Sequence, residues 1–222
     1  MLFALRISLL DRPGMLALVA GGLGQIGADI VTLDVVERGD GRATDVFCVQ
    51  AREGLAEAIR RSVEAVTGAV VEAIRPVSAP PDSSAPLHLA AEMTSGGDDV
   101  LPLLVRRLPV VLWASWSMAV RVGDDEPVLL ARGPGAPTGM AFDTPWLPLY
   151  EACRLPAAQW MPSPWRISAS TGTLEMAAAP LGDDGSAAVL IARKWGARFL
   201  PVEVRQLGIL ATIAGRRLPI AV

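Results

Sequence analysis

Residues that commonly carry chemistry are scarce in this sequence, which has one histidine, two cysteines and one lysine among 222 residues. Cys48 and Cys153 lack the spacing of a zinc site and fall in regions that we assign to different domains, so we expect two free thiols and no bound metal. His88 has no acidic or cysteine cluster around it, which favours a surface position over a catalytic one. No nucleophile motif or phosphate-binding loop occurs in its proper context. We therefore expect a binding protein that is not an enzyme and that uses no cofactor.

Long apolar runs and clustered positive charge are also missing. The longest apolar stretch, residues 110–120, is interrupted by serines and is shorter than the roughly 20 residues of a membrane-spanning helix. Residues 1–10 lack the basic segment, long apolar run and cleavage site of a signal peptide. The formal charge is −3 and the arginines are scattered, which argues against a nucleic-acid-binding surface. We expect a cytoplasmic protein that contacts neither a membrane nor nucleic acid.

Apolar residues, by contrast, make up 51% of the chain. This fraction excludes a disordered protein and indicates either a well-filled core or a surface that is covered by a partner. The length allows one or two domains, since single domains of about 150 residues are common and some reach 250. We therefore expect a folded protein that forms oligomers.

The most informative stretch is residues 11–17, where an apolar strand passes into a helix. Before it, apolar and polar residues alternate with the period of a strand that has one buried face. The buried positions are Phe3, Leu5, Ile7 and Leu9. After it, apolar residues recur every three or four positions up to Gly27, as on one face of a helix. Pro13 suits the first turn of that helix, because its missing N–H is one that the helix cannot use.

A turn of this kind can hold a small charged ligand. The first N–H groups of a helix have no partner within the helix and lie at its partly positive end, and Gly14 has no side chain to keep a ligand away. A carboxylate would fit these groups, and Asp11 could accept an ammonium. The sequence leaves an alternative equally open, in which Asp11 only caps the helix and Gly14 only relieves crowding.

The order of elements in the first third of the chain predicts an α+β fold. Residues 30–38 and 43–51 have the composition of strands and flank a Gly-Asp-Gly turn, which indicates a hairpin. Residues 53–68 have helical periodicity, and residues 69–77 form a further strand. The resulting order is βαββαβ, in which two helices cover one face of an antiparallel sheet and the first strand lies in the interior of that sheet.

The turn at residues 11–17 and the passage from helix to strand at residues 24–30 resemble those of ACT domains, and the resemblance covers residues 1–77. It implies a ferredoxin-like regulatory module that binds a free amino acid and pairs side by side with a second ACT domain. It also implies ligand contacts, in the turn and near the end of the helix. The corresponding residues are Asp11, Gly14, Met15, Leu16, Gln25 and Ile26.

Residues 22–27 offer a competing interpretation, because they match the GxGxxG pattern of dinucleotide-binding proteins. In those proteins the pattern opens a long helix. Here the following residues, 28–36, are rich in β-branched side chains and lead directly into the Gly-Asp-Gly turn. This context makes nucleotide binding the weaker of the two interpretations.

Residues 78–86 consist of proline, serine, alanine and aspartate without a large apolar side chain, which is typical of a linker, so we expect a second domain at residues 87–222. For this domain we predict an interrupted helix and two strands, and later three more strands and a last helix. Between them, residues 133–164 show no periodicity, and only residues 146–153 favour a short helix. The first helical pattern is at 87–108, the strands are at 110–122, 128–132, 165–170, 174–181 and 187–193, and the last helix is at 201–218.

The end of this region is similar to the C-terminal part of GAF domains, from Pro180 through the Gly-Asp-Asp-Gly turn to a helix that follows Phe199 and contains Glu203. The resemblance implies a GAF-like antiparallel sheet and leaves the ligand of this domain open, because the cysteine-histidine pair and the cysteine cluster of two known branches do not occur. Five of the six tryptophans lie within residues 113–165 and could form an aromatic pocket, although a sheet core with an interface explains them more simply.

Together these features favour a non-catalytic regulatory protein, in which the ACT-like domain binds a free amino acid and the GAF-like domain relays the signal to a protein partner or senses a second ligand. The alternative is a structural dimerisation or scaffold protein that binds no small molecule. We expect a homodimer from the apolar composition, the exposed edge of a four-stranded sheet and an apolar stripe on the last helix. The stripe consists of Val204, Leu207, Ala211, Ala214 and Leu218.

Overall fold

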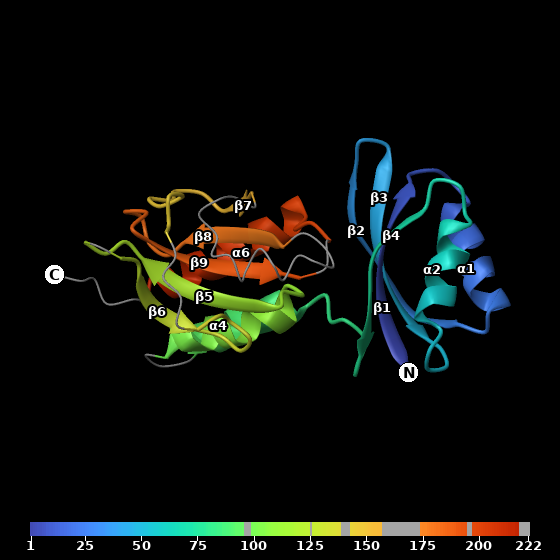
Figure 1. The fold of residues 1–222 in the computed structure, drawn as a ribbon, viewed down its shortest axis with the longest axis horizontal. Helices are drawn as coiled ribbons and strands as arrows, with labels where there is room; N and C mark the ends of the chain where they lie inside the picture. Colours follow the sequence, from blue (N-terminus) through green and yellow to red (C-terminus); the bar gives the residue numbers. More distant parts are fainter. Residues whose placement is uncertain (96–98, 125, 139–142, 157–173, 195–196, 218–222) are drawn as a thin grey trace. The chain divides into compact units, whose positions relative to one another are not determined.

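The chain forms two compact units, Met1–Ser83 and Ser84–Val222, each with its own antiparallel sheet (Figure 1). The structure is a computed structural model that describes residues 1–95, 99–124, 126–138, 143–156, 174–194 and 197–217. Both units mix helices and strands, so the protein has an α+β fold. Within the described ranges, no helix has the length and apolar character needed to cross a membrane.

The first unit has the predicted βαββαβ order. Its elements are β1 (Leu2–Leu10), α1 (Met15–Gln25), β2 (Asp29–Gly39), β3 (Arg42–Gln50), α2 (Ala56–Glu64) and β4 (Val70–Val77). The strands lie in the order β2-β3-β1-β4 with every neighbouring pair antiparallel, which places β1 in the interior as predicted. Helices α1 and α2 cover one face of this sheet (Figure 1).

The core of the first unit lies between the sheet and the two helices. All four apolar positions predicted for β1 are buried, with exposed fractions of 4% or less, and they pack against residues of both helices such as Leu23 and Ile59. The tip of the β2–β3 hairpin turns at Asp40 and Gly41, whose φ angles of 53° and 72° match the twist of the flanking strands. The alternate residues Ala4, Arg6 and Ser8 are also buried, with exposed fractions of 9% or less, so the prediction that β1 has only one buried face is wrong.

The second unit is a five-stranded antiparallel sheet with helices on one face. Its elements are α3 (Ala85–Ser95), α4 (Val100–Val111), β5 (Trp116–Arg121), β6 (Val128–Arg132), β7 (Cys153–Leu155), β8 (Glu175–Pro180), β9 (Ala187–Arg193) and α6 (Pro201–Gly215). The strands lie in the order β6-β5-β9-β8-β7. Residues of all three helices form one core with one face of the sheet. On the opposite face, Trp116 and its neighbours in the strands pack with Trp146, Leu147 and Leu149 of a loop.

The predicted strand at 110–122 is wrong in its first half. Helix α4 continues to Val111, the chain reverses at Trp113, which has a φ of 52°, and β5 begins only at Trp116. A hydrogen bond from the next strand compensates for Pro109 within this helix. The proline ring lacks the N–H that would bond to the carbonyl of Val105, and the buried hydroxyl of Ser117 donates to that carbonyl instead. A short apolar run fits helix and strand equally, so the sequence pattern did not separate them.

Two further predictions need correction. Residues 146–153 form irregular backbone that ends in β7, not a short helix. On α6, three members of the predicted dimer stripe, Leu207, Ala211 and Ala214, are buried in the core of their own unit, so that stripe gives no reason to expect a dimer. The predicted strand at 165–170 and Leu218 lie outside the described residues.

Candidate functional site

The turn between β1 and α1 differs in detail from the sequence prediction. Helix α1 begins at Met15, so Pro13 precedes the helix and Gly14 is its N-cap residue. No side chain caps this helix end, which shows that the predicted capping role of Asp11 is wrong. Instead, the backbone N–H of Asp11 donates to the carbonyl of Gly41 at 2.9 Å and ties the turn to the tip of the β2–β3 hairpin. The carboxylate of Asp11 is therefore left exposed beside the helix end.

Gly14 is required by its backbone conformation. Its φ is +89°, in the left-handed region that L side chains rarely adopt. A Cβ atom at this position would meet no atom within 4 Å, so crowding is not the reason for the glycine. The N–H of Met15 donates to the carbonyl of Arg12 at a long 3.4 Å, and the N–H of Leu18 closes the first helical turn on the carbonyl of Gly14 at 3.1 Å. The turn thus leaves open space beside Gly14 and no side-chain cap at the start of α1.

A hollow of about 60 Å³ lies between this turn and strands β1, β2 and β3. The turn and α1 contribute Asp11, Arg12, Met15 and Leu16, which brings three of the six predicted ligand contacts together. The hairpin contributes Val35, Arg38, Ala43 and Asp45, and β1 contributes Leu9 and Leu10. At roughly 30 Å³ per water molecule, the hollow holds the equivalent of about two waters, which suits one charged group of a small ligand.

Asp45 of β3 is the most unusual group in this hollow. It is 1% exposed, and its Oδ1 makes no hydrogen bond to any of the described residues. β3 places it between Ile7 of β1 and Val35 of β2. Burial, the main cause, raises the pKa of the Asp45 carboxyl, the nearby guanidinium of Arg38 lowers it, and the carboxylate of Asp11 raises it.

The charges around the hollow are balanced, with two carboxylates and two guanidiniums. Asp11 and Asp45 supply the negative groups, and Arg12 and Arg38 supply the positive ones. A zwitterion complements such a set, because each of its charges finds an opposite charge. A metal ion is a poorer fit, since guanidiniums repel cations, and the described residues hold no group of three side chains suited to a metal.

Asp45 and Arg38 were not predicted as site residues, although the sequence held a signal for Asp45. In the alternating pattern of β3, Asp45 takes the same face as Phe47 and Val49, both of which are buried. An acidic residue at an inward position of a half-buried strand is uncommon and often functional. The partner charges could not be found in this way, because Arg38 reaches the hollow from a different strand.

Gln25 and Ile26 lie elsewhere. They line a groove of about 730 Å³ between α1 and α2, together with residues such as Arg61 and Ser62. The structure therefore separates these two predicted contacts from the hollow at the turn. The same region carries the GxGxxG pattern, which lies in the last turns of α1 and the residues that follow, not at the start of a helix.

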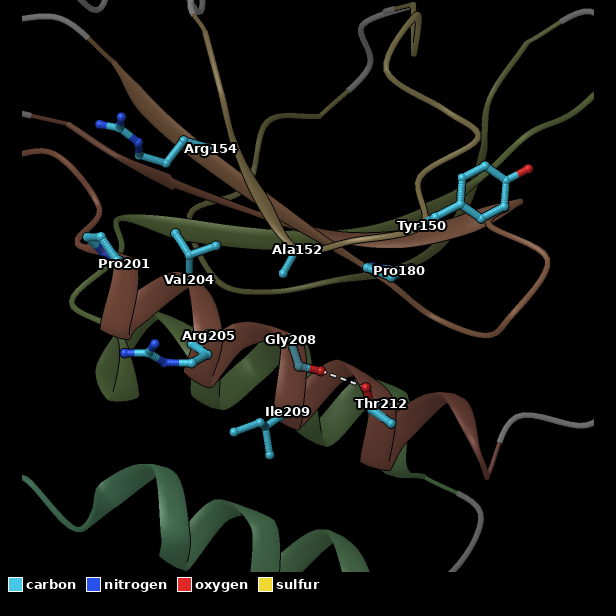
Figure 2. A pocket seen from close by; sticks show the side chains of 10 residues that line it. All are labelled: Tyr150, Ala152, Arg154, Pro180, Pro201, Val204, Arg205, Gly208, Ile209 and Thr212. Atoms are coloured by element: carbon cyan, nitrogen blue, oxygen red, sulfur yellow. Dashed lines mark hydrogen bonds between the residues drawn. The ribbon is translucent and has the colours of Figure 1, made fainter.

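The second unit has a shallow groove of about 600 Å³ along α6 (Figure 2). Val204, Arg205, Gly208, Ile209 and Thr212 form its helical wall, and the hydroxyl of Thr212 is satisfied by the carbonyl of Gly208 at 2.8 Å. Tyr150 and Arg154 lie at opposite ends of the groove in Figure 2. The side chains are spread along an open surface and do not converge on one point, so the groove offers no defined ligand position.

The described tryptophans of the second unit do not line an open pocket. Trp116 is 2% exposed within the core, Trp146 packs against the same cluster, and Trp113 lies at the reversal after α4. Trp160 and Trp165, which the predicted aromatic pocket included, lie outside the described residues. His88 is an exposed residue of α3, and Cys48 and Cys153 are free thiols in different units.

Comparison with known proteins gives only remote likenesses. No family model matches the sequence, and no curated protein matches it. A protein from Galdieria sulphuraria is 11% identical over 97% of this chain and 90% of its own, with a TM-score of 0.32. The regulatory subunit of aspartate kinase from Thermus thermophilus is 20% identical over 43% of this chain and 75% of its own, with a TM-score of 0.30.

A formyltetrahydrofolate deformylase from Burkholderia mallei is 22% identical over 43% of this chain, with a TM-score of 0.30. The chain spans only 38% of that deformylase. These values are too low to assign a family.

Proposed function

We propose that the first unit is an ACT-type regulatory module that binds a free amino acid at the β1–α1 turn. The second unit would then relay the bound state to a protein partner, and the protein acts by binding and not by catalysis. The observation that carries this proposal is the balanced set of two carboxylates and two guanidiniums around the hollow at the β1–α1 turn. The predicted βαββαβ order of residues 1–77, present in the structure, supports the same assignment.

In this proposal the two ends of the amino acid bind different groups. The carboxylate binds near the N-terminus of α1 and the guanidiniums of Arg12 and Arg38, where the helix dipole favours negative charge. The ammonium binds on the acidic side of the hollow, which includes Asp11. Because the hollow of about 60 Å³ takes one charged group, the rest of the amino acid, including its side chain, extends beyond it. A scaffold protein without a ligand is the alternative to this function.

We expect calorimetric titration to detect binding of at least one of the twenty protein amino acids to the full chain. Asp11→Asn should weaken that binding by up to about tenfold, because it removes a charge-assisted contact that water partly screens. Asp40→Asn is the matched control, since Asp40 is exposed at the hairpin tip with a φ of 53°, a conformation that asparagine tolerates. No binding of any amino acid, together with no rise in melting temperature, would support the scaffold.

The proposal includes a homodimer that forms through β2, an edge strand of the first sheet. Val31, Leu33 and Val35 alternate along β2 and are 40–46% exposed, so this edge presents both unpaired backbone groups and apolar side chains. Val35 also lines the hollow. A partner copy at this edge would therefore lie close to the bound amino acid and could cover its side chain.

We expect light scattering to give twice the chain mass of 23.3 kDa for the wild type at micromolar concentration. Leu33→Lys should shift the protein to the monomer, because a charge at the centre of the interface is desolvated without a partner. Val70→Lys is the control, since Val70 is 49% exposed on β4, the opposite edge strand. A monomeric wild type, or equal effects of both lysines, would contradict a dimer through β2.

A further inference from the structure

The first unit buries the side chain of an aspartate, Asp45 of β3. Asp45 is 1% exposed, and its Oδ1 has no hydrogen-bond partner among the described residues. A buried carboxylate without such partners destabilises a folded protein. An apolar residue at this position would avoid that cost, and asparagine would lower it because it carries no charge. Oδ1 of Asp45 is therefore available to accept a hydrogen bond from a ligand.

The position of Asp45 indicates which part of a ligand it would contact. It lines the hollow beside Arg38, facing the turn that carries Asp11. Asp11 is exposed, so water weakens any ion pair that it makes, whereas Asp45 is buried and an ion pair with it is screened less. Of the two acidic groups, Asp45 is thus the better partner for a small cation that displaces water from the hollow.

We propose that Asp45 receives the ammonium of the bound amino acid, and that the hollow therefore selects ligands that carry both a primary ammonium and a carboxylate. This inference rests on the proposed function and adds the residue that anchors the ligand. The ammonium occupies the inner part of the hollow against Asp45, and the carboxylate stays on the outer side toward Arg12 and Arg38. The three N–H groups of the ammonium can donate to Oδ1 of Asp45 and still reach Asp11.

The proposal also predicts that stability and amino acid binding depend on pH through Asp45. The charged groups that face Asp45 are Asp11 and Arg12 from the turn and Arg38 from β2, while β1 and α1 present apolar side chains. Burial raises the pKa of Asp45 above its ordinary value of 3.8. The folded state then binds more protons than the unfolded state between pH 3.8 and the raised pKa, so stability falls as pH rises through that window. Amino acid binding should strengthen over the same window, because only the ionised carboxylate pairs with an ammonium.

The test uses the full chain, calorimetry and three probes. These are the tightest-binding of the twenty protein amino acids, its N-acetyl derivative and the amine that lacks its carboxyl group. We expect the wild type to bind only the intact amino acid. Asp45→Asn should weaken its binding at least about tenfold, and by more than Asp11→Asn does. Asp34→Asn is the control, because Asp34 of β2 pairs with Val46 and lies outside the lining of the hollow.

Thermal unfolding at neutral pH provides an independent readout. Asp45→Asn should raise the melting temperature of the first unit, because it removes a buried charge whose Oδ1 makes no hydrogen bond to the described residues, whereas loss of a structural aspartate would lower it. Affinity of Asp45→Asn within threefold of the wild type would overturn the assignment of Asp45 and leave the proposed function intact. Binding of the N-acetyl derivative as tightly as the amino acid would also overturn it. A wild type that binds no amino acid would overturn both proposals.

Discussion

Replacing Arg193 by methionine is expected to cost the second unit about 3–5 kcal/mol of unfolding free energy. The side chain is 8% exposed and lies where β9 meets the end of α4 and the start of α6. Nη2 of Arg193 donates to Oε1 of Glu203 at 2.6 Å and to the carbonyl of Leu112 at 2.7 Å, and Nε donates to the carbonyl of Trp113 at 2.9 Å. The guanidinium also stacks on the ring of Phe199, 4.1 Å from its centre. Methionine can fill the volume but makes none of these bonds.

The largest part of the cost comes from Glu203, whose side chain is only 14% exposed. Its Oε2 accepts the N–H of Leu200 at 2.7 Å and holds the first turn of α6, so the carboxylate cannot turn away to water without loss of that contact. Removal of the guanidinium takes away the partner that lies 2.6 Å from this largely buried charge. A loss of 3–5 kcal/mol is a large share of the roughly 5–15 kcal/mol that stabilises a typical domain.

Urea unfolding followed by tryptophan fluorescence measures this effect in the second unit alone, because all six tryptophans lie in residues 84–222. Arg107→Met is the matched control. Arg107 pairs with Glu92 at 3.6 Å, with both side chains 44–45% exposed, so its loss should cost less than about 1 kcal/mol. Adding Glu203→Gln to Arg193→Met should restore part of the stability, since the charge disappears while the carbonyls of Leu112 and Trp113 still lack the donors that Arg193 supplied. Equal stability of the two methionine variants would refute this account.

Local patterns explain why the first unit was easier to predict from the sequence. Apolar residues in each helix and strand of this unit repeat with the period of that element. The glycines of the β1–α1 turn and the hairpin tip have the positive φ angles that glycine favours. The hollow brings together residues of β1, the turn, β2 and β3. Only the turn could be identified, since a side chain such as Arg38 has no sequence signal for a partner that another strand provides.

Non-local contacts explain the errors in the second unit. The sequence from Val110 to Leu112 is typical of a strand. In the structure helix α4 continues to Val111, with a hydrogen bond to it from Ser117 in the following strand. Arg193 fits the predicted strand at 187–193, but its partners Leu112 and Trp113 lie about 80 residues earlier in the chain. The apolar stripe on α6 was correctly identified as a stripe. Whether it packs inside its own unit or against another copy depends on where the sheet lies, which periodicity does not reveal.

Gly133→Ala is expected to destabilise the second unit by about 2–6 kcal/mol, the other large effect. Gly133 follows β6, and its N–H donates to the backbone carbonyl of Ser117 at 2.9 Å. A Cβ atom here would lie 2.2 Å from the carbonyl oxygen of Val105 and 2.7 Å from Oγ of Ser117. The first of these is backbone of α4, so the strand and the helix must separate, at a cost of about 1–3 kcal/mol. Separation also breaks the bond from Ser117 to Val105, which adds about 1–3 kcal/mol for a buried carbonyl left unpaired.

Two variants show whether the clash or the hydrogen bond dominates, again by urea unfolding and tryptophan fluorescence. Ser117→Ala removes only the bond to Val105 and should cost about 1–3 kcal/mol, less than Gly133→Ala. Gly208→Ala is the control for adding a methyl group, because its Cβ would lie 3.1 Å from the Cβ of Ala152 and alanine favours the helix, so its effect should stay within about 1 kcal/mol. Since Pro109 is what deprives Val105 of its helical partner, Pro109→Ala should reduce the cost of Ser117→Ala by supplying an N–H. If Gly133→Ala unfolds at the same urea concentration as Gly208→Ala, the close approach of β6 to α4 does not hold this unit together.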